Sequence, residues 1–117
     1  MNGFEMRFRA AGNDYDAALE RTAGDTELLG QLMLMFKSDG GFAALSKALE
    51  EDDCKAAFAA AHSLKGSSGM LGMDPLFAVM SEITEALRAG ELEPAKTAFP
   101  KAKDEYEKVL AIIGELC

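Results

Sequence analysis

Helical spacing of apolar residues runs through this 117-residue chain and restricts it to one fold class. Apolar side chains recur three or four residues apart, as Leu76, Val79 and Ile83 do. This spacing places them on one face of a helix. No stretch alternates apolar and polar residues over the length of a strand, and no hairpin signal separates β-branched runs. The sequence therefore predicts an all-α fold.

Short turn signals interrupt the helical pattern and indicate how the helices are arranged. Asp52 or Asp53 is placed to cap the helix that follows it. Asp74 and Pro75 are typical of an N-cap followed by proline at the first helical position. Because the turns are short, successive helices are expected to lie antiparallel. We predict an up-and-down antiparallel four-helix bundle with an additional N-terminal helix.

The bundle is expected to form one domain with a small extension before it. Residues 1–13 are interpreted as an N-terminal extension, with a short and loosely held helix from Phe4 to Ala11. Residues 14–115 are interpreted as the helical bundle domain. Pro100 lies inside the last helical stretch and is expected to break or kink it.

Composition excludes several classes of function. The net charge of −8 argues against nucleic-acid binding, which needs a basic patch. The sequence has neither a signal peptide nor an apolar run long enough to cross a membrane, so we expect a cytoplasmic protein without membrane contact. Cys54 and Cys117 are too few for a disulfide framework, and neither has metal-ligand spacing to a histidine. We therefore expect no metal site in this chain.

The segment around His62, which is the single histidine, has two contrasting helical faces. The side expected to face the core carries small and apolar residues: Ala57, Ala61, Leu64, Ser68 and Leu71. The side that contains His62 also carries Phe58, Lys65, Gly66, Gly69 and Met73. Glycine costs a helix about 1 kcal/mol relative to alanine, so two glycines on this side indicate that open space matters there. We expect a large partner to approach His62, with Met70 in the core.

An isolated, exposed histidine suits phosphoryl transfer better than other chemistry. A Ser-His-Asp system needs a partner serine, and Ser63 points about 100° away on the helix. A metal site needs several ligands. Neutral imidazole can accept a phosphoryl group on nitrogen, while Lys65 can neutralise the phosphoryl oxygens and Gly66 leaves room for the partner. The chain has no phosphate-binding glycine loop, so the phosphoryl group must come from another protein.

The motif around the histidine resembles the signature of histidine phosphotransfer (HPt) domains of multistep phosphorelays. The motif consists of residues 62–68 (HSLKGSS) with Leu71 and Gly72 after them. Residues 24–29 (GDTELL), followed by Phe36, are similar to the second helix of that family. The resemblance extends over roughly residues 14–113.

The resemblance implies a role for each residue of the motif. His62 would be the phosphoacceptor, Lys65 the phosphate support and Gly66 the small residue that keeps access open. The partners would be response-regulator receiver domains and a hybrid histidine kinase, and Mg²⁺ would be bound by the receiver. The chain would carry the phosphoryl group as a monomer, and it would not be a self-sufficient enzyme. From the helical wheel we assign Phe58, Gly69 and Met73 to the partner-binding surface.

Other interpretations stay open at this point. A phosphoacceptor domain of a chemotaxis-type histidine kinase shares the fold. A binding module could dock on receivers without transferring phosphate. The dimerisation helices of a histidine kinase fit poorly, because that class has an acidic residue directly after its histidine and a proline soon after. Here Ser63 follows, and the next proline is Pro75.

Overall fold

The structure, a computed structural model, describes residues 3–116 and confirms the all-α prediction. Met1, Asn2 and Cys117 lie outside the described residues. Within them the chain forms seven α-helices and a short 3₁₀ turn, without a β-strand. The elements are α1 (Gly3–Ala10), α2 (Tyr15–Arg21), α3 (Thr26–Ser38), α4 (Gly41–Glu50), α5 (Cys54–Met70), α6 (Asp74–Arg88), α7 (Leu92–Ile113) and η1 (Gly114–Leu116).

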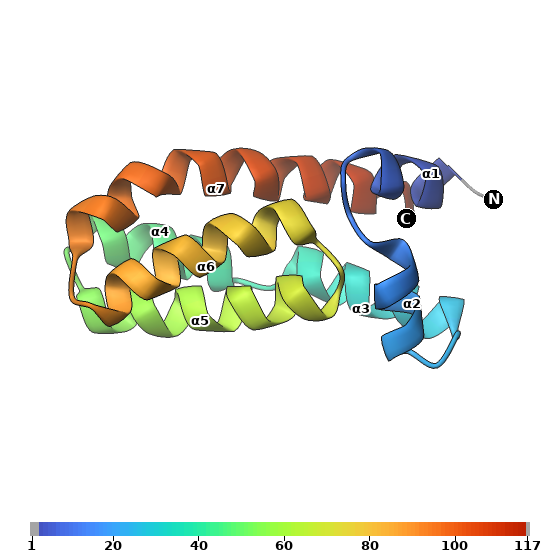
Figure 1. Cartoon of the computed structure of the whole chain (residues 1–117), viewed down its shortest axis with the longest axis horizontal. Coiled ribbons are helices and arrows are strands. Elements are labelled where there is room, and N and C mark those ends of the chain that lie inside the picture. Colours follow the sequence, from blue (N-terminus) through green and yellow to red (C-terminus); the bar gives the residue numbers. More distant parts are fainter. Residues whose placement is uncertain (1–2, 117) are drawn as a thin grey trace.

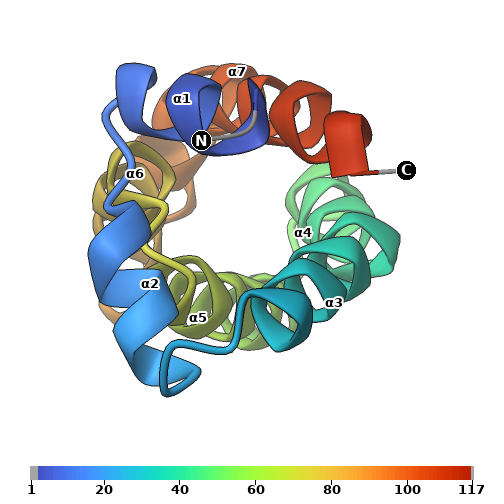
Figure 2. The ribbon, with the colours of Figure 1, turned by 90° about the vertical axis from the view of Figure 1, so that its right-hand side faces the viewer.

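The helices form an elongated up-and-down bundle with principal extents of 43 × 23 × 21 Å. Helices α4, α5, α6 and α7 follow one another around the bundle, and each packs against the next (Figure 1). Seen along the long axis, α3 and α4 share one corner, while α5, α6 and α7 occupy the other three (Figure 2). The predicted four-helix arrangement is therefore confirmed, with one corner divided between α3 and α4.

The core is built from the apolar stripes that the helical spacing predicted. Leu76, Val79 and Ile83 of α6 are almost completely buried, as are Leu45 of α4 and Ile113 of α7. The buried hydroxyl groups of Ser68 and Thr84 are satisfied within their own helices: each donates to the carbonyl oxygen four residues earlier at 2.7 Å. Three of the four buried residues of α5 are small, namely Ala57, Ala61 and Ser68, which lets α4 and α6 approach this helix.

Aspartate caps begin three of the helices. Asp14, Asp25 and Asp53 each accept a hydrogen bond from a backbone N–H in the first turn, at 2.9–3.0 Å. The start of α6 differs by one residue from the prediction. Met73 is the N-cap, and Asp74 is the first helical residue, with Pro75 beside it in the first turn. The choice between Asp52 and Asp53 is settled in favour of Asp53.

The N-terminal helix packs into the bundle, so the expectation of a loosely held helix was wrong. Phe8 of α1 is 0% exposed, and its ring lies 5.3 Å from Phe4 and 6.3 Å from Tyr15. Arg9 forms a bidentate ion pair with Asp16 of α2, at 2.7 and 3.0 Å, and bonds Glu5 at 3.1 Å. We call Glu5, Arg9, Tyr15 and Asp16 the Arg9 clamp. It joins α1 to α2.

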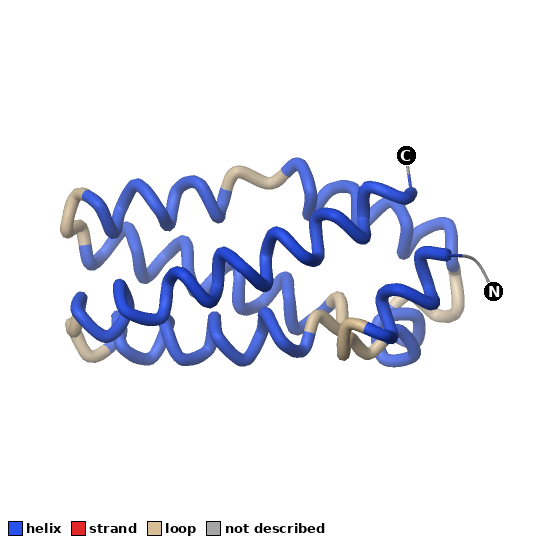
Figure 3. The backbone as a smooth tube through the Cα atoms, turned by 90° about the horizontal axis from the view of Figure 1, so that it is seen from above, coloured by secondary structure: helices blue, strands red, loops and turns tan. Residues whose placement is uncertain are grey.

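Helix α7 continues through Pro100 (Figure 3). Proline cannot donate the backbone bond to the carbonyl four residues earlier, which is that of Lys96. Ala95 and Ala102, on either side of the proline, are both fully buried. Packing on both sides therefore holds α7 in one helix although a backbone hydrogen bond is missing. The expected break at Pro100 does not occur.

The connection between α5 and α6 is a tight turn that also holds α2. Gly72 has φ +70°, a conformation that favours glycine, and its carbonyl oxygen accepts a hydrogen bond from the N–H of Asp14 at 2.8 Å. A Cβ at position 72 would lie 2.3 Å from the carbonyl oxygen of Asp14. The close approach of the two backbones therefore requires glycine at this position, and it places α2 beside the end of α5.

Candidate functional site

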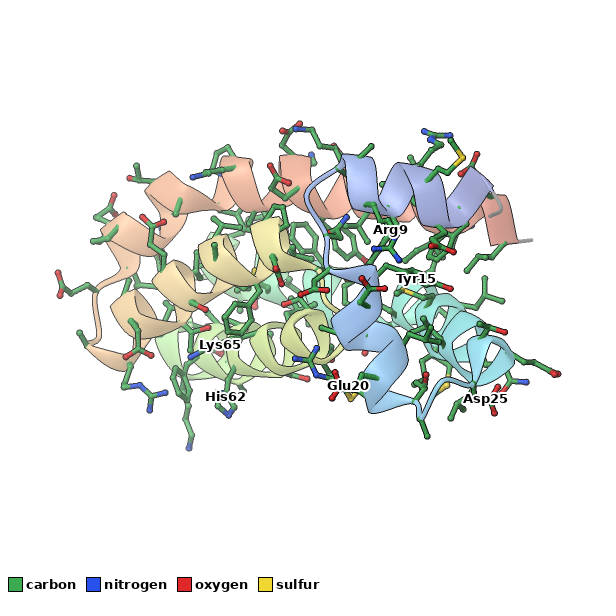
Figure 4. The ribbon with its side chains drawn as sticks, turned by 45° about the vertical axis from the view of Figure 1, so that its right-hand side comes forward. Arg9, Tyr15, Glu20, Asp25, His62 and Lys65 are labelled. Carbon is green, nitrogen blue, oxygen red and sulfur yellow. The ribbon has the colours of Figure 1, made fainter. Side chains whose placement is uncertain are left out.

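Helix α5 presents His62 on the side of the bundle that faces solvent. The residues predicted to face the core are buried without exception: Ala57, Ala61, Leu64, Ser68 and Leu71. His62 is exposed, and Figure 4 shows it pointing outward from α5, with Lys65 labelled on the same helix. The division of α5 into two faces is therefore confirmed.

An open groove of about 480 Å³ begins at His62 and runs along the second half of α5. We call it the His62 groove. Its residues come from α2, α5 and α6: Arg21, His62, Lys65, Gly66, Gly69, Met70, Asp74 and Phe77. Three residues predicted for the site, namely Lys65, Gly66 and Gly69, thus share one surface with His62.

The two glycines of the groove have different structural settings. A Cβ added at Gly66 would meet no atom within 4 Å, so this position borders open space. A Cβ at Gly69 would lie 2.9 Å from the ring of Phe77. Gly66 therefore leaves the groove open one turn after His62, whereas Gly69 makes room for an aromatic side chain of α6.

The groove contains two cationic side chains in a strongly acidic protein. Within residues 3–116, neither Lys65 nor Arg21 forms a salt bridge with a carboxylate. One guanidinium nitrogen of Arg21, Nη1, donates to the carbonyl oxygens of Gly69 and Met70 at 2.8 and 3.0 Å. Both positive charges therefore remain available to an anionic group that enters the groove.

Two methionines lie on the opposite sides from those expected. Met73, assigned to the partner surface, is 0% exposed, and Met70, expected in the core, is 48% exposed. The helical wheel was extended past the end of α5, but Gly72 reverses the chain there. Met73 consequently turns into the core as the N-cap of α6. Met73 therefore lies outside the candidate site, whereas Met70 belongs to it.

Sequence reasoning also missed Arg21, Asp74 and Phe77 as parts of the groove. Arg21 is 48 residues from Gly69 in the chain, so no local pattern could connect them. Phe77 is 37% exposed although the surrounding helix is strongly amphipathic. An exposed aromatic residue next to a polar face was the one signal that could have marked it.

Phe58 lies one turn before His62, on the other side from the groove. Its half-buried ring stacks on the imidazole, with 5.7 Å between ring centroids and 14° between ring planes. The guanidinium of Arg88, from α6, lies 5.0 Å from the centroid of the same ring. Phe58 therefore contacts the candidate phosphoacceptor itself.

Two general features of the chain concern membranes and metal ions. In residues 3–116, no helix combines the length and the apolar character needed to cross a lipid bilayer. Over the same residues, the histidine, cysteine, aspartate and glutamate side chains form no group of three or more that could hold a metal ion.

Comparison with known proteins gives the family. The sequence profile of the Hpt domain matches residues 26–112, which extend from the start of α3 almost to the end of α7. The chain is 28% identical over 104 residues to the phosphorelay intermediate protein rdeA of Dictyostelium discoideum. That alignment covers 87% of the chain and 41% of the relative, so the chain spans about two fifths of that protein. No solved structure matches significantly. The Hpt profile covers most of the bundle and the whole segment that carries His62, and the chain belongs to the Hpt domain family.

Proposed function

We propose that this protein carries phosphoryl groups in a multistep phosphorelay, with His62 as the phosphoacceptor between receiver-domain aspartates. The observation that carries the proposal is the His62 groove. An exposed imidazole stands beside open space at Gly66 and beside Lys65, whose charge has no carboxylate partner within residues 3–116. The relative from Dictyostelium is named as a phosphorelay intermediate, which supports the same role.

The chemical step needs little from the carrier beyond position and charge. A lone pair on one imidazole nitrogen attacks the phosphorus of the receiver's aspartyl phosphate. The N–P bond forms as the P–O bond to the aspartate breaks, and that electron pair leaves with the carboxylate. The proton on the other ring nitrogen is not transferred. Because the transition state is loose, alignment and neutralisation of the phosphoryl oxygens dominate the rate.

The residues around His62 would have separate roles in this step. Lys65 supports the phosphoryl oxygens by charge and by donation from its ammonium group. Gly66 admits the receiver's active site next to His62. Met70 and Phe77 take the place of Met73 as exposed apolar surface beside the groove. Phe58 stays a candidate for the partner surface, because its ring is half-exposed beside His62.

The partners and conditions follow from this chemistry. We propose receiver domains of response regulators as partners, with a hybrid histidine kinase as the source of the phosphoryl group. Mg²⁺ would be bound by the receiver, and the carrier would need no cofactor of its own. The protein would then act as a phosphoryl carrier and would not be a self-sufficient enzyme. A monomeric state and a cytoplasmic location stay predictions of the sequence.

The test is transfer of labelled phosphate from phosphorylated receiver domains of the same genome to wild-type protein and to His62→Gln. We expect acid-labile label on wild type alone, with equal thermal stability of the two proteins. Label on both proteins would show that the phosphoacceptor is a residue other than His62. Receiver binding without label would favour the docking module, and label that comes only from a kinase domain would favour the phosphoacceptor domain of a chemotaxis-type kinase.

A further inference from the structure

His62 lies between one turn of α5 that carries an aromatic side chain and one turn that carries only a glycine. One turn before it, the Phe58 ring stacks on the imidazole at 5.7 Å and 14°. One turn after it, Gly66 leaves space in which a Cβ would touch nothing within 4 Å. The imidazole is therefore supported on one side and free on the other, which is the side of the groove.

Phe58 is itself held in place by side chains of two helices. It packs against the hydrophobic core from its position on α5. The guanidinium of Arg88 lies over its ring at 5.0 Å, and the Nε atom of Arg88 donates to Glu85 at 3.2 Å. Contacts between a guanidinium and an aromatic face are attractive. Helix α6 thus restrains the ring that contacts the imidazole. We call Arg88, Phe58 and His62 the Phe58 stack.

Support of this kind matters because a histidine ring turns easily. The outer torsion of a histidine side chain has a broad distribution rather than sharp staggered positions. In a free ring, rotation about this torsion would move the nucleophilic nitrogen through a range of positions. Only some of these positions allow in-line attack on phosphorus. A ring stacked on one face has fewer orientations open to it, and orientation contributes to reaction rate.

We propose that Phe58 is a positioning residue for phosphoryl transfer, which holds the His62 imidazole with one nitrogen directed toward the groove. The proposal rests on the proposed function of His62. It differs from the assignment of Phe58 to the docking surface, because a docking residue sets the affinity for the receiver. A positioning residue sets the rate of transfer once the receiver is bound.

The experiment compares Phe58→Leu with Phe58→Tyr and with a matched control, Phe99→Leu. Leucine keeps an apolar side chain at position 58 and removes the ring, whereas tyrosine keeps the ring. Phe99, on α7, is also half-buried against the core, and its ring stacks on Phe42 rather than on the histidine. Three quantities are measured: the transfer rate at saturating phosphorylated receiver, the affinity for the receiver, and the NMR shifts of the His62 ring protons.

We expect Phe58→Leu to slow saturated transfer about tenfold and to change receiver affinity less than about twofold. The upfield ring-current shift of the His62 protons should disappear in Phe58→Leu and persist in Phe58→Tyr, which should also keep the rate. Phe99→Leu should leave both the His62 shifts and the saturated rate as in wild type.

Two results would overturn the proposal. One is an unchanged saturated rate in Phe58→Leu, and the other is a loss confined to affinity, which would make Phe58 a docking residue. Failure of the proposed function has a different signature, since wild type itself would then take no label from any receiver. In that case the positioning role is also wrong, even if the ring-current shifts confirm the stack.

Discussion

The Arg9 clamp and the His62 groove use positive charge in opposite ways (Figure 4). In the clamp, Arg9 bonds both Asp16 and Glu5, and its guanidinium lies 5.1 Å from the centroid of the Tyr15 ring. In the groove, Lys65 and Arg21 have no carboxylate partner within residues 3–116. The charges of the clamp are thus paired with one another, and these pairs join α1 to α2.

This difference distinguishes residues whose charges stabilise the fold from residues whose charges are available to a bound partner. A carrier must bind an anionic phosphoryl group without rearranging its own salt bridges, so a groove whose cations are not paired is ready for it. Substitutions in the clamp region should therefore change stability and leave transfer by the folded protein unchanged. Substitutions in the groove should do the reverse.

The largest expected effect is on stability, at the aromatic cluster beneath the clamp. Phe8→Ala removes a fully buried ring and should lower the free energy of unfolding by about 3–5 kcal/mol, as measured by urea denaturation. Transfer to His62 in the folded fraction should be unchanged. If this variant does not fold, Phe8→Leu gives the same test with a smaller loss of stability. Slower transfer by fully folded protein would show that α1 takes part in the site.

Lys65→Ala should affect transfer and leave stability unchanged. Loss of its charge should slow transfer from the receiver by at least about tenfold, while the free energy of unfolding stays within about 0.5 kcal/mol of wild type. Lys55→Ala is the matched control, because Lys55 is an exposed lysine on the same helix. Equal slowing in both variants would point to overall charge and would contradict a local role for Lys65.

Gly66→Ala should raise stability and lower activity at once. Its methyl group meets no atom within 4 Å, and alanine favours a helix over glycine by up to about 1 kcal/mol. Gly30→Ala, on α3, has equally open surroundings and should give the same gain in melting temperature. Only the Gly66 variant should transfer more slowly. Normal transfer by Gly66→Ala would mean that the receiver does not approach over this turn.

The smallest expected effect is a pH dependence of the clamp. The hydrogen bond from Arg9, with further help from its charge, holds the pKa of Asp16 below its usual value of 3.8. The contribution of this carboxylate to stability is therefore complete above pH 3.8 and is lost as the pH falls through the lower pKa of the folded state. Asp16→Asn should be slightly less stable than wild type at pH 6, and the difference should vanish near pH 2. A difference that grows as the pH falls would contradict this assignment.

Local signals predicted much of the fold. Asp53 placed the start of α5, and the spacing of small and apolar residues divided this helix correctly into a buried and an open face. These predictions succeeded because helix capping and amphipathicity depend on residues within a few positions of one another. Pro100 is the exception, because buried residues on both sides outweigh its local preference.

Contacts between distant segments could not be predicted in the same way. Arg21 reaches the groove from α2, and this depends on the close approach of Asp14 and Gly72. Met73 was misplaced because the helical period ends at a glycine with positive φ. The site residues on α5 could therefore be predicted from the sequence. Those from α2 and α6 could not, because they depend on how these helices pack against α5.

The hydrogen bonds from Arg21 have an electrostatic consequence for the proposed phosphorylated state. An α-helix carries partial negative charge at its C-terminal end, where carbonyl groups lack helical partners. Gly69 and Met70 provide such carbonyls at the end of α5, about two turns beyond His62. Their field would repel a phosphoryl dianion on the same helix. A guanidinium bound to both carbonyls opposes that field, so α5 can carry the added negative charge at lower energy than an uncapped helix end would allow.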